Sequence, residues 1–491
     1  KGSSVIYSAN DYEFAGTARI IIQTSLLTVY TQKMRILLVV CLFLSLASCG
    51  DQSGRETSVI EGVTIIDAVN GVRENQTVVF IGDEIIQIFP TDESPDFPNA
   101  IDGSGQYLIP GLWDFHVHLT YDVRLTAAMP ELFLSWGITS VRDTGGLMRN
   151  ILPVVDSMNK EGAVSPRVYF AGPLLDGNLV VYNGVGRPEI GVSVRTPEEA
   201  RQAVRELYDD GISFIKIYEL TSPEVFSALI DVADELGLPV DSHVPLSMRA
   251  SVAGAQVDSI EHLRNIELDC AANADELLIA RIRQLENPDG LSGADLRASL
   301  HNSQRLPAIR NYNERQCNQT IEALSATMMV PTLRLNSIAL NPPYEKDDWE
   351  DALSRLPASV RAQWFIEGER RKTTELGDLT FAEWSLSLTK QMHESGVPFG
   401  AGTDVPINLS IPGYSLHSEL EMLVMAGLAP IDALAAATIK PAQYFSLEEE
   451  MGSIDIGKRA DMVLLEANPL DDIRNTKRIN LVISKGRILE F

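Results

Sequence analysis

The sequence predicts an α/β fold made of repeated strand-then-helix units, and three observations support this prediction. Short apolar runs recur along the chain, and most of them end at a polar residue or a break. Stretches with apolar residues at helical spacing fall between several of these runs. The length of 491 residues, with 45% hydrophobic and 22% charged residues, suits a globular chain with one large domain and an appendage.

Eight apolar runs are candidate strands of the repeated units. They cover residues 112–118, 139–143, 167–171, 214–218, 240–243, 259–262, 328–333 and 399–404. Helices are expected over residues 198–210 and 223–236, the second after a Thr-Ser cap. Further strands are expected near the two ends of the chain, over residues 58–67, 77–88, 460–465 and 480–484. Two long segments, 264–327 and 334–396, should carry helices of their own or shape a functional mouth.

The first strand of the repeated units ends in two histidines, His116 and His118, one residue apart. Because side chains alternate along a strand, both imidazoles project to one face, and Asp114 shares that alternation. Two such imidazoles can hold one metal ion. By itself the pair is also compatible with chance or with a hydrogen-bonded pair in a core.

Other metal-type side chains stand where later apolar runs end. The chain has only seven histidines, and His243 and His262 follow two such runs. Asp404 ends another run. Four imidazoles and one carboxylate form a ligand set suited to zinc, or to manganese, iron or cobalt.

Lys216 lies inside an apolar run, between Ile215 and Ile217. A buried ammonium is costly and would repel bound cations. This lysine is therefore expected to be neutral, paired with a nearby carboxylate, or chemically converted.

In order and spacing, these residues resemble the amidohydrolase superfamily, over nearly the whole chain after residue 57. Residues 108–114 and 452–465 carry the same resemblance, which within the superfamily is greatest to imidazolonepropionase-related and Xaa-Pro dipeptidase-like members. It implies a (β/α)8 TIM barrel with a small β-sandwich built from both chain ends. Its implied metal ligands are His116, His118, Lys216, His243, His262 and Asp404. It also implies two divalent ions, zinc being the first choice, and carbon dioxide bound to Lys216 as a bridging carbamate.

The implied organisation divides the chain into six parts. These are an upstream or non-native segment (1–33), a signal peptide (34–49), a tether (50–57), the first part of the β-sandwich (58–108), the barrel (109–449) and the second part of the sandwich (450–491). The alternative for the two ends is a pair of unrelated extensions.

The implied activity is hydrolysis of a C–N amide bond by a metal-bridging hydroxide, with Asp404 as both ligand and base. Small peptides, Xaa-Pro-like dipeptides and N-acyl amino acids are the expected substrates. Tyr218, Tyr182 and His417 are candidate substrate contacts, although each could equally be structural. An imidazolonepropionase-like cyclic-amide hydrolase and a catalytically inactive solute-binding lipoprotein are the alternatives. A deaminase is disfavoured because no glutamate stands three residues after His243.

The N-terminal region resembles a bacterial export signal. A basic start at residues 33–35 precedes an apolar core and Leu46-Ala-Ser-Cys49, which resembles a lipobox. Cleavage would leave Cys49 lipidated and the protein anchored on the periplasmic side of a membrane. A buried helix with a chance cysteine is the alternative.

The expected partners follow from charge and location. A formal charge of −27 disfavours nucleic acid, so the partners are a small-molecule or peptide substrate and, through the lipid alone, a membrane. A homo-oligomer stays open. Cys270 and Cys317 could form a disulfide in an exported protein or remain two free thiols.

Overall fold

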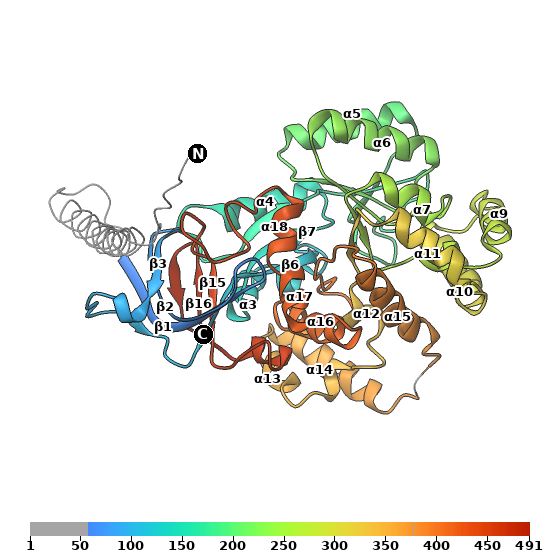
Figure 1. The fold of residues 1–491 in the computed structure, drawn as a ribbon. Helices are drawn as coiled ribbons and strands as arrows, with labels where there is room; N and C mark the ends of the chain where they lie inside the picture. The colour runs from blue at the N-terminus through green and yellow to red at the C-terminus, as the bar shows by residue number, and fades with distance from the viewer. Residues whose placement is uncertain (1–56, 376) are drawn as a thin grey trace, which may run out of the picture. The chain divides into compact units, whose positions relative to one another are not determined.

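The computed structural model describes residues 57–375 and 377–491, and residues 57–491 form one compact unit (Figure 1). The predicted signal peptide, lipidated Cys49 and nearly all of the tether lie outside the described residues. Within the described part of the chain, no helix combines the length and the apolar character needed to cross a bilayer.

Both ends of this unit contribute to one eight-stranded sheet. In Figure 1 the blue N-terminal strands lie beside the red C-terminal ones. Its strands are β1 (Thr57–Asp67), β2 (Gly71–Ile81), β3 (Glu84–Pro90), β4 (Ile101–Asp102), β5 (Tyr107–Pro110), β15 (Met462–Leu465), β16 (Ile479–Ser484) and β17 (Arg487–Leu489). The antiparallel pairing of β5 with β15 joins the two ends. The two-layer sandwich remains a prediction, because the strands are paired as a single sheet.

One expected strand in this region is wrong in its bounds. The run predicted over 77–88 is divided between β2 and β3, which pair with each other in antiparallel fashion. The chain turns at Gly82, whose φ of 54° lies in the left-handed region that glycine adopts without strain. The Gly-Asp dipeptide at this position is typical of a turn, and the prediction of one continuous strand did not take it into account.

The repeated units form two parallel sheets, as expected for an α/β fold. One has the order β6-β7-β8 and the other β10-β9-β11-β12-β13-β14. Their strands are β6 (Leu112–Val117), β7 (Ile138–Asp143), β8 (Arg167–Phe170), β9 (Leu174–Asp176), β10 (Gly191–Ser193), β11 (Ile215–Ile217), β12 (Val240–Ser242), β13 (Ser259–Glu261) and β14 (Met328–Val330). Seven of the eight predicted runs therefore contain a strand, and the arrangement is TIM-barrel-like.

The eighth run, 399–404, is not a regular strand, although it occupies a strand's place. The amide of Gly400 donates to the Met329 carbonyl at 2.9 Å, and the amide of Phe115 donates to the Ala401 carbonyl at 2.9 Å. This run therefore connects β14 with β6. A Cβ atom at Gly402 would lie 2.6 Å from the Cβ atom of His116, so glycine permits the close approach.

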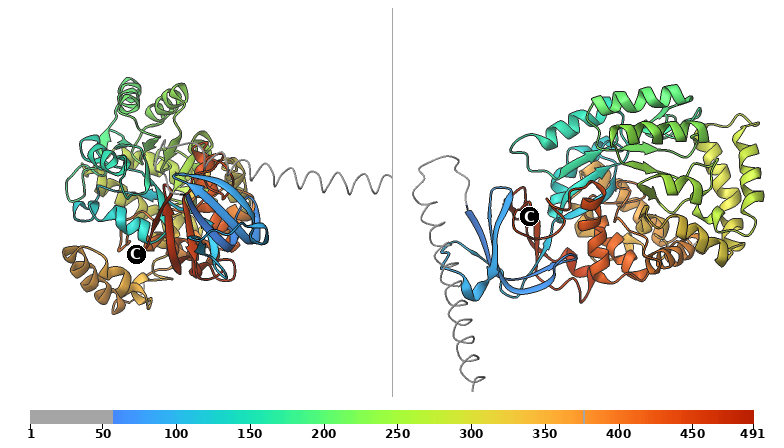
Figure 2. Two further views of the ribbon diagram at one scale, coloured as in Figure 1. Left: turned by 90° about the vertical axis from the view of Figure 1, so that its left-hand side faces the viewer. Right: turned by 45° about the horizontal axis from the view of Figure 1, so that its top comes forward.

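Helices alternate with the parallel strands and lie outside them, as Figure 2 shows. Those in the first half are α2 (Val123–Thr126), α3 (Met129–Ser135), α4 (Met148–Asn159), α5 (Pro197–Asp209), α6 (Pro223–Leu236) and α7 (Ala250–Ala253). Helices α5 and α6 confirm the two predicted helices. The Ser222 hydroxyl caps α6 by accepting a hydrogen bond from the Val225 amide at 3.4 Å.

The two long segments carry helices of their own, as predicted. The first holds α8 (Ile266–Asp269), α9 (Ala274–Leu285), α10 (Gly293–Arg310) and α11 (Glu314–Ala323). The second holds α12 (Leu333–Asn336), α13 (Trp349–Ser354), α14 (Ala358–Lys372) and α15 (Thr380–Glu394). The helices α16 (Tyr414–Met425), α17 (Pro430–Ala436) and α18 (Ile439–Tyr444) follow Asp404. Short 3-10 turns cover Thr91–Glu93, Gly254–Gln256, Pro343–Glu345 and Ile473–Lys477.

A disulfide between Cys270 and Cys317 crosslinks the first long segment. It joins the end of α8 to α11, and both cysteines are buried. Of the two alternatives that the sequence left open, the structure has the disulfide.

Candidate metal centre

A cavity of about 200 Å³ opens at the C-terminal ends of the parallel strands. TIM-barrel-like proteins carry their active sites at this end. All six predicted ligands line this cavity, namely His116, His118, Lys216, His243, His262 and Asp404. Residues nearly 300 positions apart in the sequence are thus brought to one place.

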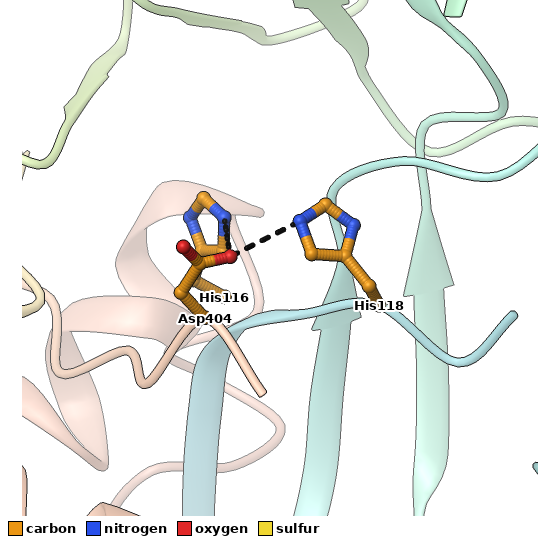
Figure 3. Close-up of side chains that lie close together, drawn as sticks. All are labelled: His116, His118 and Asp404. Atoms are coloured by element: carbon orange, nitrogen blue, oxygen red, sulfur yellow. Dashed lines mark ion pairs between the residues drawn. The ribbon is translucent and has the colours of Figure 1, made fainter. Parts of the chain in front are cut away.

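Three of these residues form a compact group (Figure 3). One ligand atom from each of His116, His118 and Asp404 lies within 4.8 Å of the others. Asp404 Oδ1 lies 3.4 Å from His116 Nε2 and 3.2 Å from His118 Nε2. Two imidazole nitrogens and a carboxylate oxygen that converge in this way match the donors that zinc-type ions take in proteins.

The histidines on the neighbouring strands complete the cluster. The ring of His262 is centred 4.7 Å from that of His116 and 4.8 Å from that of His243. The backbone is locally unusual here, because His262 and Asp404 have φ values of 62° and 58°. Left-handed conformations at non-glycine residues are uncommon and are concentrated at functional sites.

The Asp404 backbone is held by a residue on the first barrel strand. The Asp114 carboxylate accepts hydrogen bonds from the amide of Thr403 at 3.0 Å and from its hydroxyl at 2.6 Å. The Asp404 amide donates to the His116 carbonyl at 2.8 Å. Asp114, which shares the strand alternation of the histidines, therefore supports the turn that carries Asp404.

The outer nitrogen of each histidine is engaged away from the cavity. Nδ1 of His118 contacts the Gly145 carbonyl at 3.2 Å, and Nδ1 of His243 contacts a Glu219 carboxylate oxygen at 2.8 Å. A carbonyl or carboxylate only accepts, so these Nδ1 atoms carry the proton and Nε2 keeps its lone pair. Nδ1 of His116 contacts Glu261, and Nδ1 of His262 lies 2.7 Å from the Thr332 hydroxyl. Outer partners of this kind orient metal-binding histidines.

The electrostatics of the compact group also fit a cation. Burial lowers the pKa of His116, but the Glu261 and Asp404 carboxylates outweigh it and raise that pKa to about 9. Asp404 Oδ1 is buried and accepts no hydrogen bond from the described residues. Two carboxylates, one at each nitrogen of the ring, therefore stabilise a positive charge on His116. The donors of the compact group thus fit the divalent ion that was expected from the sequence resemblance.

Lys216 is paired with a carboxylate, one of the interpretations that its sequence context allowed. Its Nζ atom lies 2.9 Å from Asp241 Oδ2 on the neighbouring strand β12. Burial raises the pKa of Asp241, and the nearby Glu261 charge raises it further. The other oxygen, Asp241 Oδ1, is buried and has no hydrogen-bond partner among the described residues.

Arg142 fills the interior beneath the cavity and ties three strands together. Its guanidinium donates to the Phe115 carbonyl at 2.7 Å, to the Ser259 hydroxyl at 2.9 Å and to Glu261 Oε1 at 2.5 Å. It lies over the Phe115 ring, 3.8 Å from the centroid. Since Glu261 also contacts His116, a buried arginine outside the cavity supports a candidate ligand through one carboxylate.

Helix α10 supports His243 in a comparable way. Glu219 accepts from His243, from Arg297 at 2.8 Å and from His301 Nε2 at 2.5 Å. Arg305 donates to the other nitrogen of His301 at 2.9 Å, which fixes that ring as neutral. His301 therefore has a structural role, since both of its ring nitrogens are engaged within the protein. Sequence reasoning missed Glu219, although it directly follows the candidate Tyr218.

The three predicted substrate contacts have different outcomes. Tyr218 and Tyr182 line the cavity, with ring centroids 5.8 Å apart. His417 does not reach the cavity, which corrects that prediction. It is fully buried on α16, with Nδ1 at 2.9 Å from the Thr476 hydroxyl and Nε2 at 3.1 Å from the Trp136 carbonyl. The face of α16 that carries it packs toward the C-terminal segment rather than toward the strand ends.

Comparison with known proteins gives one family match and several related enzymes. Residues 378–489 match the Amidohydrolase family. A dihydroorotase from Pelotomaculum thermopropionicum is 25% identical over 451 residues, which cover 88% of this chain and 95% of that protein. An imidazolonepropionase from Symbiobacterium thermophilum is 39% identical over 77 residues, which cover 16% of this chain and 18% of that protein.

A solved structure shows a likeness of fold over a similar share of the chain. A Xaa-Pro dipeptidase with methionine bound in its active site superposes with a TM-score of 0.62 at 21% identity, over 89% of this chain and 100% of that one. These matches support the amidohydrolase superfamily. They support a hydrolase as well, and the convergent triad of His116, His118 and Asp404 agrees with the metal dependence that is general in this family.

Proposed function

We propose that this chain is a metal-dependent amidohydrolase that cleaves a C–N amide bond in a small peptide, a Xaa-Pro-like dipeptide or an N-acyl amino acid. The supporting observation is the convergence of four imidazoles, Lys216 and Asp404 on one cavity. His116, His118 and Asp404 would hold one divalent ion, and His243 and His262 a second. Lys216, carboxylated by carbon dioxide, would lie between them. Zinc is the ion that best suits these donors.

The residues divide the chemistry between them. Bound ions would supply Lewis acidity toward the scissile carbonyl and favour ionisation of water near neutral pH. Asp404, buried among the histidines, takes the proton of the attacking water and passes it to the leaving nitrogen. The neighbouring imidazoles of His262, His116 and His118 hold the pKa of Asp404 well below its usual value in spite of burial, so it is ionised before the reaction. The Tyr218 hydroxyl is placed to donate to the substrate.

A cyclic-amide hydrolase resembling imidazolonepropionase is the second candidate. The short match to an imidazolonepropionase favours it. Lys216 disfavours it, since a single-ion site has no need of a bridging anion. A deaminase is less consistent with the chain, because Val244, Pro245 and Leu246 follow His243 and no glutamate takes the proton-shuttling place. An inactive solute-binding lipoprotein would be expected to lack some of the six ligands.

The proposed location is outside the cytoplasm, anchored through lipidated Cys49. The disulfide between Cys270 and Cys317 supports this proposal, because such bonds form and persist in oxidising compartments and are rare in the cytosol. Labelling with a radioactive fatty acid in a bacterial host tests it, with Cys49→Ala as the matched variant. Equal labelling of both proteins would contradict lipidation at this residue.

Metal analysis together with a substrate panel tests the proposed activity. We expect roughly two zinc-type ions per chain and turnover of dipeptides or N-acyl amino acids. One ion, with activity on cyclic amides alone, would favour the second candidate. No bound ion would contradict both.

Replacement of Lys216 tests the bridging role. Lys216→Ala should lose bound metal and activity together, and small carboxylic acids should partly restore both by occupying the place of the carbamate. The exposed Lys160 provides the matched control, since Lys160→Ala removes an ammonium far from the cavity. Full metal content and activity in Lys216→Ala would overturn the bridging role.

A further inference from the structure

The cavity is strongly basic although the chain is acidic. Three arginines line it, Arg187, Arg264 and Arg297, and Asp404 is the one acidic residue among its described lining residues. The chain as a whole has a formal charge of −27. The positive charge of the cavity is therefore local. Because a cleft focuses the electric field of the side chains that line it, this cavity favours the entry of negatively charged ligands.

One of the three arginines is neutralised by a buried carboxylate, because Arg297 Nη2 lies 2.8 Å from Glu219. The other two, Arg187 and Arg264, make no ion pair and no hydrogen bond within the described part of the chain. Both are half-buried. An arginine carries five donors in a rigid fork, so these two guanidinium groups offer donors that the protein leaves unused.

The unused donors lie beside the tyrosines of the cavity. Arg187 lies over the Tyr182 ring, 5.5 Å from its centroid, and the Tyr182 ring is 5.8 Å from that of Tyr218. The Tyr218 ring is centred 4.5 Å from that of His243. Arg264 follows the candidate ligand His262 by two residues. The positive end of the cavity therefore adjoins the histidines instead of lying at a distant rim.

The rest of the wall is apolar. Leu174, Ile190, Leu335 and Ile407 line the cavity together with the charged groups. A small site with apolar walls and a few convergent polar groups fixes the orientation of its ligand through those groups. Guanidinium forks match the planar, bidentate geometry of a carboxylate, and they bind it better than they bind a neutral amide.

We infer that Arg187 and Arg264 form an anion subsite for a free carboxylate of the substrate. This inference rests on the proposed function and deepens it. The substrates are amides that carry a carboxylate close to the scissile bond, as N-acyl amino acids and dipeptides do, with an apolar group against Leu335 and Ile407. Neutral amides of the same shape leave both arginines without a partner.

Matched substrates test the subsite. N-acetyl-L-leucine and N-acetyl-L-leucinamide differ in one group, a carboxylate in the first and a neutral carboxamide of similar shape in the second. L-alanyl-L-proline and its amide provide a second comparison of the same kind. We expect the metal-loaded protein to prefer each carboxylate in kcat/KM by roughly 10- to 100-fold, the range of a charge-assisted hydrogen bond. Arg264→Gln and Arg187→Gln should each reduce that preference about 10-fold, and Arg264→Lys should retain part of it. Arg201→Gln, on the exposed face of α5, is the matched control.

A binding measurement separates this inference from the proposed function. Calorimetry on protein stripped of metal with a chelator compares the affinities for N-acetyl-L-leucine and for its amide without a contribution from bound ions. Selective binding of the carboxylate that Arg264→Gln weakens about 10-fold supports the subsite, even if no amide in the panel is hydrolysed. Equal affinity for the two compounds, or a preference that survives in both arginine variants, overturns it, even if amides are hydrolysed.

Discussion

Glu219→Gln is the most informative single substitution, because Glu219 never lines the cavity and yet orients a candidate ligand. The carboxylate accepts from three donors, on His243, Arg297 and His301. Glutamine keeps the size but turns one oxygen into an NH2 group. That group must face either His243 Nδ1 or His301 Nε2, and each of these nitrogens carries a proton. A donor therefore meets a donor.

The size of the effect follows from these contacts. Loss of an outer partner of a metal-binding histidine typically reduces metal affinity or activity by about 10- to 100-fold, which corresponds to about 1.4–2.8 kcal/mol. We expect this range for the more weakly held of two ions, because His243 belongs to the half of the site without Asp404. The ion between His116 and His118 should be retained more tightly.

Competition with a chromophoric chelator measures both dissociation constants. Glu267→Gln is the matched control, because Glu267 is equally buried in the same region but contacts none of the cavity histidines. Glu267 is buried and forms an ion pair with Arg305 at 3.6 Å. Unchanged metal affinity in Glu219→Gln, or an equal loss in Glu267→Gln, would refute the orienting role.

Two further predictions concern stability. Burial and then the Lys477 charge lower the pKa of His417 to about 3, so the folded protein resists protonation there. Below pH 6.5 this histidine takes up a proton in the unfolded chain but not in the folded one, so the free energy of unfolding falls as pH decreases from 6.5 toward 3. At pH 5 the loss is about 2 kcal/mol. His417→Gln should flatten the pH dependence of urea unfolding, and an unchanged slope would contradict this. Replacing Cys270 and Cys317 together by alanine should lower the free energy of unfolding by about 4 kcal/mol, from the closed loop with a sequence separation of 47. An unshifted urea midpoint would show that the bond contributes nothing.

The ligand candidates were predictable because strand alternation and strand ends are local signals. His116, His118 and Asp404 stand where apolar runs stop, and parallel strands bring their ends together. The partners of the histidines were not predictable, since Glu219 and Glu261 act across strands and only the folded chain shows which acceptor each Nδ1 meets. His417 was a candidate substrate contact because it follows the run that ends at Asp404. The orientation of α16 about its own axis places His417 away from the cavity, and short-range sequence patterns do not determine that orientation.

The surface turn at Gly82 and the disulfide illustrate two different limits. The Gly-Asp dipeptide indicates the turn, but the apolar residues on both sides of it favoured the prediction of a single strand. The pairing of Cys270 with Cys317 depends on a distance between two helices, which spacing in the sequence does not give. Helices α5 and α6 were placed correctly because capping residues and apolar periodicity agree there.

The ring of acceptors behind the histidines bears on attempts to transplant this constellation into another scaffold. Copying the six side chains that face the cavity would leave four imidazoles free to rotate and to exchange tautomers. A sufficient graft also includes the acceptors supplied by Glu219, Glu261, Thr332 and the Gly145 carbonyl. Glu261 in turn brings Arg142, which is inserted between three strands. The smallest portable unit is therefore a substantial part of the barrel interior.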